Sequence, residues 1–265
     1  MFSLSIPDFP NVSLVAFYGD KPFRLAASIA QLQTYLSEST ILRHKFTSYQ
    51  LGQVHGTIVG CEGLKTERGV MSKWFWEGRK KIRYIDLSGF LNYLLDSDHL
   101  PMNIRFGGYD PSIDYNYLSR DRHPYQRSFQ LQPSGEQTLL AVLIGWPCWE
   151  DFISLDLDYL RRDAQKFNLL HKYHILSEQV DNDFYMRLGV IEGKLSPEAI
   201  ATLEKEIGEM LRAKSFFDVT IKPENLAFAR YQELSLPLET TTILPLIQAT
   251  SGKLEALYSI QLEPL

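Results

Sequence analysis

Residues 54–59, Val-His-Gly-Thr-Ile-Val, decide how we interpret this chain. Side chains of a β-strand alternate between its two faces, so His55 and Thr57 point to one face and their apolar or small neighbours to the other. The polar face pairs an imidazole, which exchanges a proton near neutral pH, with a hydroxyl that can hold a phosphate oxygen. The stretch therefore predicts a strand with a candidate catalytic pair. An ordinary polar strand face is the alternative, because short motifs often occur by chance.

Hydrophobic periodicity divides the rest of the chain into two halves with the same order of elements. The first half predicts a strand at 12–18, a helix at 23–37, a strand at 53–60, a helix at 86–95 and a strand at 102–106. The second half predicts a strand at 138–146, a helix at 151–171, a strand at 183–191, a helix at 196–213 and a strand at 216–221. The repeated order indicates an internal duplication, although the side chains of the two halves differ.

In each half the middle strand carries two polar side chains at positions i and i+2. They are His55 and Thr57 in the first half, and Tyr185 and Arg187 in the second. If the halves face each other, the two pairs approach a common space. We therefore expect an α+β fold with two pseudo-symmetric lobes, each an antiparallel sheet with helices on its outer face, around a central cleft.

The expected organisation is a single two-lobed domain over residues 1–265. Lobe 1 covers about 10–108, a connecting loop 109–127, lobe 2 about 128–235 and a C-terminal tail 236–265. Additional strands are expected at 128–132, 226–231 and 256–262.

Two segments have a weaker pattern. Residues 62–83 are polar and basic, contain Trp74 and Trp76, and are interpreted as a loop or excursion. Pro147 is expected to end the strand before it. His171 and His174 follow the predicted long helix, and we interpret them as surface residues or helix-end cations rather than as ligands.

Composition excludes several classes of protein. With 27 basic and 32 acidic side chains the net charge is -5, so tight, charge-driven binding of duplex DNA is not expected. Cys61 and Cys148 are the two cysteines, and no Cys/His cluster has zinc spacing, so we predict neither a disulfide framework nor a metal site. The sequence lacks a signal-peptide pattern and an apolar run of membrane-spanning length, so we expect a soluble cytoplasmic protein without a membrane partner.

Several enzyme motifs are also missing. No GxGxxG sequence follows a predicted strand, and no P-loop or Gly-x-Ser-x-Gly elbow occurs. Dinucleotide oxidoreductases, nucleoside triphosphatases and serine hydrolases are therefore disfavoured.

The connecting loop at 109–127 combines basic and aromatic side chains. Arg120, Arg122 and His123 lie among four tyrosines, and such groups suit contacts with phosphates and bases. We include these three as candidate substrate-binding residues. A solvated surface loop is the alternative interpretation, since loops collect such residues in any case.

The layout, with His55-Gly56-Thr57 on the middle strand of the first half, resembles the two-histidine (2H) phosphoesterase superfamily. Members of that superfamily fold as two related α+β lobes around a cleft, and each lobe contributes a His-x-Thr or His-x-Ser motif. The resemblance implies hydrolysis of 2′,3′-cyclic phosphates, small cyclic nucleotides or RNA ends without a metal or other cofactor. One histidine takes a proton from the attacking oxygen, the other protonates the leaving oxygen, and the two hydroxyls hold the phosphate.

This chain departs from the family pattern in its second half. The equivalent position reads Tyr185-Met186-Arg187 instead of His-x-Thr. The later Asp218-Val219-Thr220 looks closer to the motif, but it falls on the strand after the equivalent one and ranks second.

The resemblance implies a role for each motif residue. His55 would be the general acid or base, while Thr57 and Arg187 would hold phosphoryl oxygens. Tyr185 would supply the second proton or a hydrogen bond, and the adjacent guanidinium is expected to lower its pKa from about 10. An ordinary amphipathic edge strand remains the alternative for this second pair.

Three functions stay open at this point. The first is a phosphodiesterase with altered acid chemistry. The second is a non-catalytic sensor or binding protein for a nucleotide or phosphorylated ligand in the same cleft. The third is a scaffold on which Trp74 and Trp76 form an exposed docking patch. A cavity shared by His55 and Arg187 would favour the first two functions.

Overall fold

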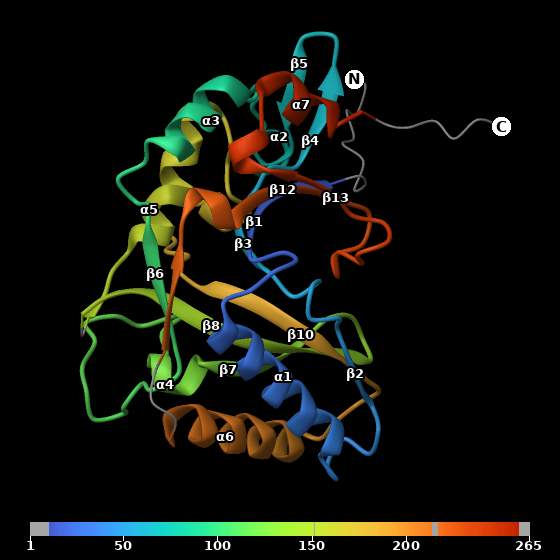
Figure 1. The fold of residues 1–265 in the computed structure, drawn as a ribbon, viewed down its shortest axis with the longest axis vertical. Coiled ribbons are helices and arrows are strands. Elements are labelled where there is room, and N and C mark those ends of the chain that lie inside the picture. Colours follow the sequence, from blue (N-terminus) through green and yellow to red (C-terminus); the bar gives the residue numbers. More distant parts are fainter. Residues whose placement is uncertain (1–10, 151, 214–216, 260–265) are drawn as a thin grey trace, which may run out of the picture.

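The computed structural model describes residues 11–150, 152–213 and 217–259, and Figure 1 shows the arrangement of its elements. In the first part of the chain these are β1 (Asn11–Ala16), α1 (Phe23–Glu38), β2 (Phe46–Ser48), β3 (Gly56–Gly60), β4 (Gly63–Thr66), β5 (Gly69–Ser72), α2 (Lys73–Arg79), α3 (Leu87–Leu95), β6 (Met102–Phe106), α4 (Pro124–Arg127) and β7 (Phe129–Pro133). The second part contains β8 (Thr138–Trp149), β9 (Phe152–Ile153), α5 (Asp156–Asp163), β10 (Phe184–Glu192), α6 (Pro197–Ala213), β11 (Phe217–Ile221), β12 (Leu226–Tyr231), β13 (Thr242–Pro245) and α7 (Ser251–Ala256).

The fold is α+β, as predicted, and is built on a large antiparallel sheet with several helices. In the described part of the chain, eleven strands join one sheet, whose main path runs β11-β6-β8-β10-β3-β1-β12-β13. Strands from the two sequence halves are mixed along this path: β12 pairs with β1, and β6 lies between β11 and β8. The strands β4 and β5 form a separate hairpin.

The two strands that carry the polar pairs are neighbours in this sheet. β3 and β10 are antiparallel, and their pairing is limited to Gly56 opposite Met186. Antiparallel register through this point sets His55 beside Arg187 and Thr57 beside Tyr185. Because the pairing does not extend, the two strands meet at one point and then diverge. Glycine is needed there, because a side chain at position 56 would collide with the Phe184 ring.

The apolar faces of β3 and β10 form the main core. Figure 1 shows α1 and α6 side by side beneath β8 and β10. Both helices have apolar residues at helical spacing, which they bury in the same cluster as the strands. The shared cluster includes Leu25, Ile29, Leu32, Ile58, Phe184, Met186, Leu188, Leu203 and Ile207. The opposite face of the two strands is therefore left for polar side chains, as the alternation predicts.

The segment 109–127 is anchored by a few buried side chains, although most of its residues are exposed. Tyr109 and Tyr115 are buried against Trp146 of β8, with the ring centroids of Tyr109 and Trp146 5.1 Å apart. Arg127 is also buried, and its guanidinium donates to the Asp183 carboxylate at 2.7 Å. The surface-loop alternative therefore fails at these buried positions, whereas Arg120 and Arg122 are exposed, as that alternative expects.

Several predicted elements end at different residues. The helix expected at 151–171 is α5, which ends at Asp163, and a 3-10 turn (Ala164–Phe167) follows. The chain then turns at Asn168, whose φ of 60° is left-handed, and this conformation ends the helical segment. Strand β8 continues through Pro147 to Trp149, because Pro147 pairs with Ile104 of β6.

The excursion and the tail also differ from expectation. Residues 62–83 contain the β4–β5 hairpin and α2, and Trp74 and Trp76 in that helix are half-buried rather than exposed. Residues 251–256 form α7 and 257–259 are not a strand, so the strand expected at 256–262 is wrong where the structure describes it. Residues 1–10, 151, 214–216 and 260–265 lie outside the described residues, and so do the parts of the predicted elements that fall there. Among the described helices, none is long and apolar enough to cross a membrane.

Candidate functional site

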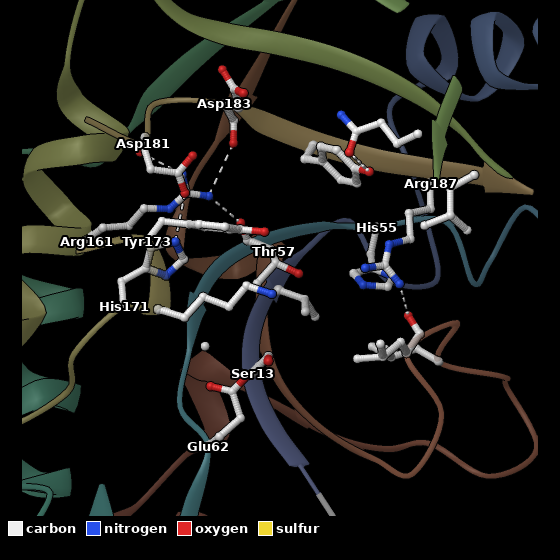
Figure 2. A pocket seen from close by; sticks show the side chains of 18 of the residues that line it. Ser13, His55, Thr57, Glu62, Arg161, His171, Tyr173, Asp181, Asp183 and Arg187 are labelled. Carbon is white, nitrogen blue, oxygen red and sulfur yellow. Dashed lines mark hydrogen bonds and ion pairs between the residues drawn. The ribbon is translucent and has the colours of Figure 1, made fainter. Parts of the chain in front are cut away.

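A cavity of about 300 Å³ lies on the polar face of the sheet, and Figure 2 shows side chains that line it. Its floor comes from β1, β3 and β10, and its walls come from the segments around residues 120, 171–183 and 231–236. Five of the predicted site residues line it: His55, Thr57, Arg120, Tyr185 and Arg187. The cavity therefore brings together both polar pairs.

His55 is half-buried and immediately precedes β3. Its Nδ1 lies 2.8 Å from the Gln53 carbonyl oxygen, and a carbonyl only accepts, so Nδ1 carries the proton and Nε2 the lone pair. Burial lowers the pKa of His55 to about 4; the Gln53 hydrogen bond opposes this shift, while Arg187 and Lys21 add to it. The imidazole is therefore neutral at pH 7, with Nε2 able to accept a proton.

Thr57 is held through its backbone by Arg161 of α5. The Arg161 guanidinium donates to the carbonyl oxygens of Thr57 at 2.9 Å and Ile58 at 2.8 Å, and to both the carbonyl and the carboxylate of Asp181. A fifth hydrogen bond reaches the Asp183 carbonyl at 3.3 Å. The five donors of this guanidinium thus fix β3 to the segment before β10. The Thr57 hydroxyl points into the cavity (Figure 2).

Arg187 lies beside His55, and Figure 2 shows its guanidinium next to the imidazole ring. One of its nitrogens donates to the Leu234 carbonyl oxygen at 3.0 Å. The other donors face the cavity lining. The bond to Leu234 therefore orients the Arg187 guanidinium, and its remaining N–H donors are available to an anion.

Tyr185 differs from expectation in its acidity. Burial raises its pKa to about 12, and the lowering effect of Arg187 is too small to offset it. The predicted drop in its pKa is therefore wrong. Its hydroxyl donates to Gln132 Oε1 at 2.8 Å. At neutral pH Tyr185 can donate a hydrogen bond but not a titrating proton.

The three loop candidates divide into two groups. Arg120 lines the cavity, where its guanidinium lies 3.7 Å from the Asp183 carboxylate. Arg122 and His123 do not line it. His123 instead caps α4, with Nδ1 accepting from the Tyr125 backbone N–H at 3.1 Å. Arg122 and His123 therefore lie outside this cavity, and their predicted contact with a ligand stays a prediction.

His171 and His174 are both buried, so their interpretation as surface residues is wrong. His171 Nε2 lies 2.8 Å from Asp181 Oδ2, and His174 Nε2 lies 2.9 Å from Asp158 Oδ1. Burial lowers the pKa of His171, so the imidazole is neutral and Nε2–H donates to Asp181. In the described part of the chain, Nδ1 of each ring has no hydrogen-bond partner.

Sequence reasoning missed several lining residues. Lys172 and Tyr173 follow His171 in the wall, with Lys172 Nζ 4.8 Å from the centre of the Tyr173 ring. Glu62 also lines the cavity and accepts a hydrogen bond from Trp74 Nε1 at 3.0 Å. These residues belong to segments without a hydrophobic period, so no pattern in the sequence indicates them.

Charge in the cavity favours an anion. Asp181 and Asp183 line it, but Arg161 contacts the first carboxylate and Arg127 the second. Glu62 also lines the cavity, and Lys172 acts on it electrostatically. Arg187 adds a positive group with no carboxylate within 4 Å among the described residues. The Arg187 guanidinium is therefore an uncompensated positive group in the cavity, with the neutral His55 imidazole beside it.

No protein-family model matches this chain, and no curated protein matches it. Among solved structures, it is similar to a conserved protein of unknown function, ATU0111 from Agrobacterium tumefaciens str. C58. The two chains are 15% identical, the alignment covers 85% of this chain and 82% of the other, and the TM-score is 0.43. A similarity at this level carries no argument about function.

Proposed function

We propose that this protein is a phosphodiesterase of the two-histidine type, acting without a metal on a small cyclic phosphate or an oligonucleotide end. One observation carries the proposal: His55 and Thr57 share a single cavity with Tyr185 and Arg187, from strands far apart in the sequence. A cavity of about 300 Å³ is at the small end of ligand sites, which supports a mononucleotide-sized ligand.

The same strands support a duplicated fold. β3 comes after α1, the first helix of the first half, and β10 comes after α5, the first helix of the second half. Each strand presents its polar pair to the cavity. We interpret their meeting point at Gly56 and Met186 as the centre of two related lobes that diverge around the site. Two related lobes of this kind are what the proposed two-histidine superfamily would require.

The proposed reaction uses the groups in the following way. His55 Nε2 takes a proton from a water molecule, whose oxygen attacks phosphorus while the bond from phosphorus to a ribose oxygen breaks. Thr57 Oγ and the Arg187 guanidinium hold the non-bridging oxygens. The released ribose oxygen is protonated from solvent, because Tyr185 has a pKa of about 12 and stays protonated. Loss of a general acid typically costs about 10²–10⁴ in rate, so we expect slow turnover.

The test is hydrolysis of 2′,3′-cyclic nucleotides in the presence of EDTA. His55→Ala should lose at least about 10²-fold in kcat/KM, the usual contribution of a general base. Arg122→Ala is the matched control, because Arg122 lies outside the cavity and should leave the rate unchanged. Wild-type activity that His55→Ala does not reduce would show that the assignment is wrong.

A non-catalytic nucleotide-binding protein is the second candidate, and the pKa of Tyr185 is the observation that favours it. Without a titrating acid opposite His55, the cavity can hold a phosphate and not turn it over. This candidate predicts thermal stabilisation by a phosphorylated ligand, without hydrolysis, that Arg187→Ala abolishes. The half-buried positions of Trp74 and Trp76 remove the basis for an exposed docking patch.

A further inference from the structure

The cavity extends well beyond the phosphate end described so far. Thr57 and Gly60 lie three residues apart on β3, a separation of about 10 Å at 3.3 Å per residue. Ser13 of β1 is paired with Gly60, and Glu62 follows two residues later. Figure 2 shows Glu62 and Ser13 at one end of the cavity, away from His55 and Arg187. A ligand that fills the cavity therefore has a second end.

We infer that Glu62, Ser13 and Trp74 form a nucleobase subsite, in which the Glu62 carboxylate accepts the adjacent N–H donors of guanine. The inference rests on the proposed function, because the phosphate of the same nucleotide lies at His55 and Arg187. It names the ligand class as a guanosine phosphate.

The position of Glu62 is built by its neighbours. Trp74 Nε1 donates to one carboxylate oxygen at 3.0 Å and holds that oxygen in place. A side chain at Gly60 would meet the same carboxylate, so glycine leaves the space that Glu62 occupies. The Ser13 hydroxyl is held at 2.9 Å by the Tyr231 hydroxyl. The carboxylate is therefore oriented by contacts that do not involve a ligand.

Glu62 also lacks full electrostatic compensation. Burial raises its pKa, although Trp74, Lys172 and Lys73 act in the opposite direction. A hydrogen bond donated by a ligand to the charged Glu62 carboxylate would offset part of the free-energy cost of burying that charge. The group is thus suited to accept donors from a ligand.

Guanine matches this acceptor better than the other bases. It presents its ring N1–H and its exocyclic amino group side by side, and the two oxygens of a carboxylate can accept both. Adenine and cytosine place a ring nitrogen acceptor beside their amino group, and uracil places carbonyl oxygens on both sides of its N–H. Each of these would bring a lone pair towards Glu62, so the subsite discriminates against them.

The experiment measures wild type and Glu62→Gln with the four nucleoside 2′,3′-cyclic phosphates, and binding of GMP and UMP by calorimetry. Each pair of ligands shares its phosphate, so a difference between them reports the base. Wild type should prefer guanosine by about 10- to 100-fold, the usual effect of a charge-assisted hydrogen-bond pair. Glu62→Gln should lose that preference, because the amide removes one acceptor for guanine and no longer opposes the carbonyl oxygens of uracil. Trp74→Phe, which removes the N–H that orients the carboxylate, should reduce the preference in the same direction.

The outcomes separate this inference from the proposed function. Equal hydrolysis of all four substrates, unchanged in Glu62→Gln, overturns the subsite and leaves the phosphodiesterase standing. Absence of hydrolysis together with a Glu62-dependent preference for GMP overturns the enzyme and supports the subsite. A preference for another base, or equal binding of GMP and UMP by wild type, overturns the subsite whichever variants fold.

Discussion

Ligand binding should raise the pKa of His55. In the empty cavity, burial holds its pKa at about 4, and Arg187 and Lys21 contribute to the lowering. A phosphodiester monoanion about 4 Å from the ring contributes about 4 kcal/mol at an effective dielectric constant of about 20. One pKa unit corresponds to about 1.4 kcal/mol, so the pKa of His55 in the complex should rise by about three units, to near 7.

The sign of the pH dependence follows from these two values. Between pH 4 and pH 7 the complex holds a proton on His55 that the free protein lacks. Association therefore takes up as much as one proton, and the affinity falls as the pH rises through that window, by at most about tenfold per pH unit. A diester is the right ligand, because its own phosphate does not titrate in this range.

The assay is isothermal titration calorimetry at pH 6 in two buffers with different ionisation enthalpies, using a slowly hydrolysed phosphorothioate diester. The control is His55→Asn, which keeps an N–H donor for the Gln53 carbonyl and does not titrate. His171 is unchanged in both proteins, so the difference in proton uptake belongs to His55. Equal proton uptake in the two proteins, with a dissociation constant that does not change with pH, would refute the reasoning.

Three further predictions concern the frame of the site. Gly56→Ala should lower the free energy of unfolding by about 1–3 kcal/mol in urea denaturation, because the added methyl group meets the Phe184 ring; unchanged stability would contradict the close approach of the strands. Arg161→Ala should cost about 3–5 kcal/mol and lower the thermal midpoint, because it leaves the Thr57 carbonyl without its donor and the buried Asp181 carboxylate without its cation; a shift within 1 °C would argue against this role. His171 has a folded-state pKa below the unfolded value of about 6.5, so its contribution to stability is present above pH 6.5 and is lost as the pH falls towards 4; His171→Asn should flatten the dependence of the unfolding free energy on pH over that range.

The core of the site could be predicted because its strands have a local pattern. Thr57 alternates with buried neighbours on β3, as do Tyr185 and Arg187 on β10, and the structure has the same alternation of half-buried and buried positions. Alternation depends only on the geometry of one strand. The pairing of β3 with β10 could be proposed only from the repeated order of elements, since it joins residues 130 positions apart.

The remaining lining residues could not be predicted, because long-range partners determine their positions. The apolar stripe that predicted the helix continues past Asp163. The α-helix nevertheless ends there, because the chain forms a 3-10 turn and then a left-handed turn at Asn168. His171 is buried because Asp181, ten residues later, accepts its N–H. Likewise, Glu62 faces the cavity because Trp74 donates to it from α2. None of these partners is at a spacing that a helix or strand period reveals.

The hydrogen bonds of Arg161 and Arg187 show that the two guanidinium groups differ in the donors they have left for a ligand. Arg161 directs all five of its donors to acceptors in β3 and in residues 181–183, so it has none left for a ligand. Arg187 makes one hydrogen bond, to Leu234, among the described residues. The strands diverge from a single pairing, so they need a rigid cross-connection, and Arg161 provides it. Of these two arginines, Arg187 is therefore the one with donors left for the proposed anion, which would lie within reach of His55.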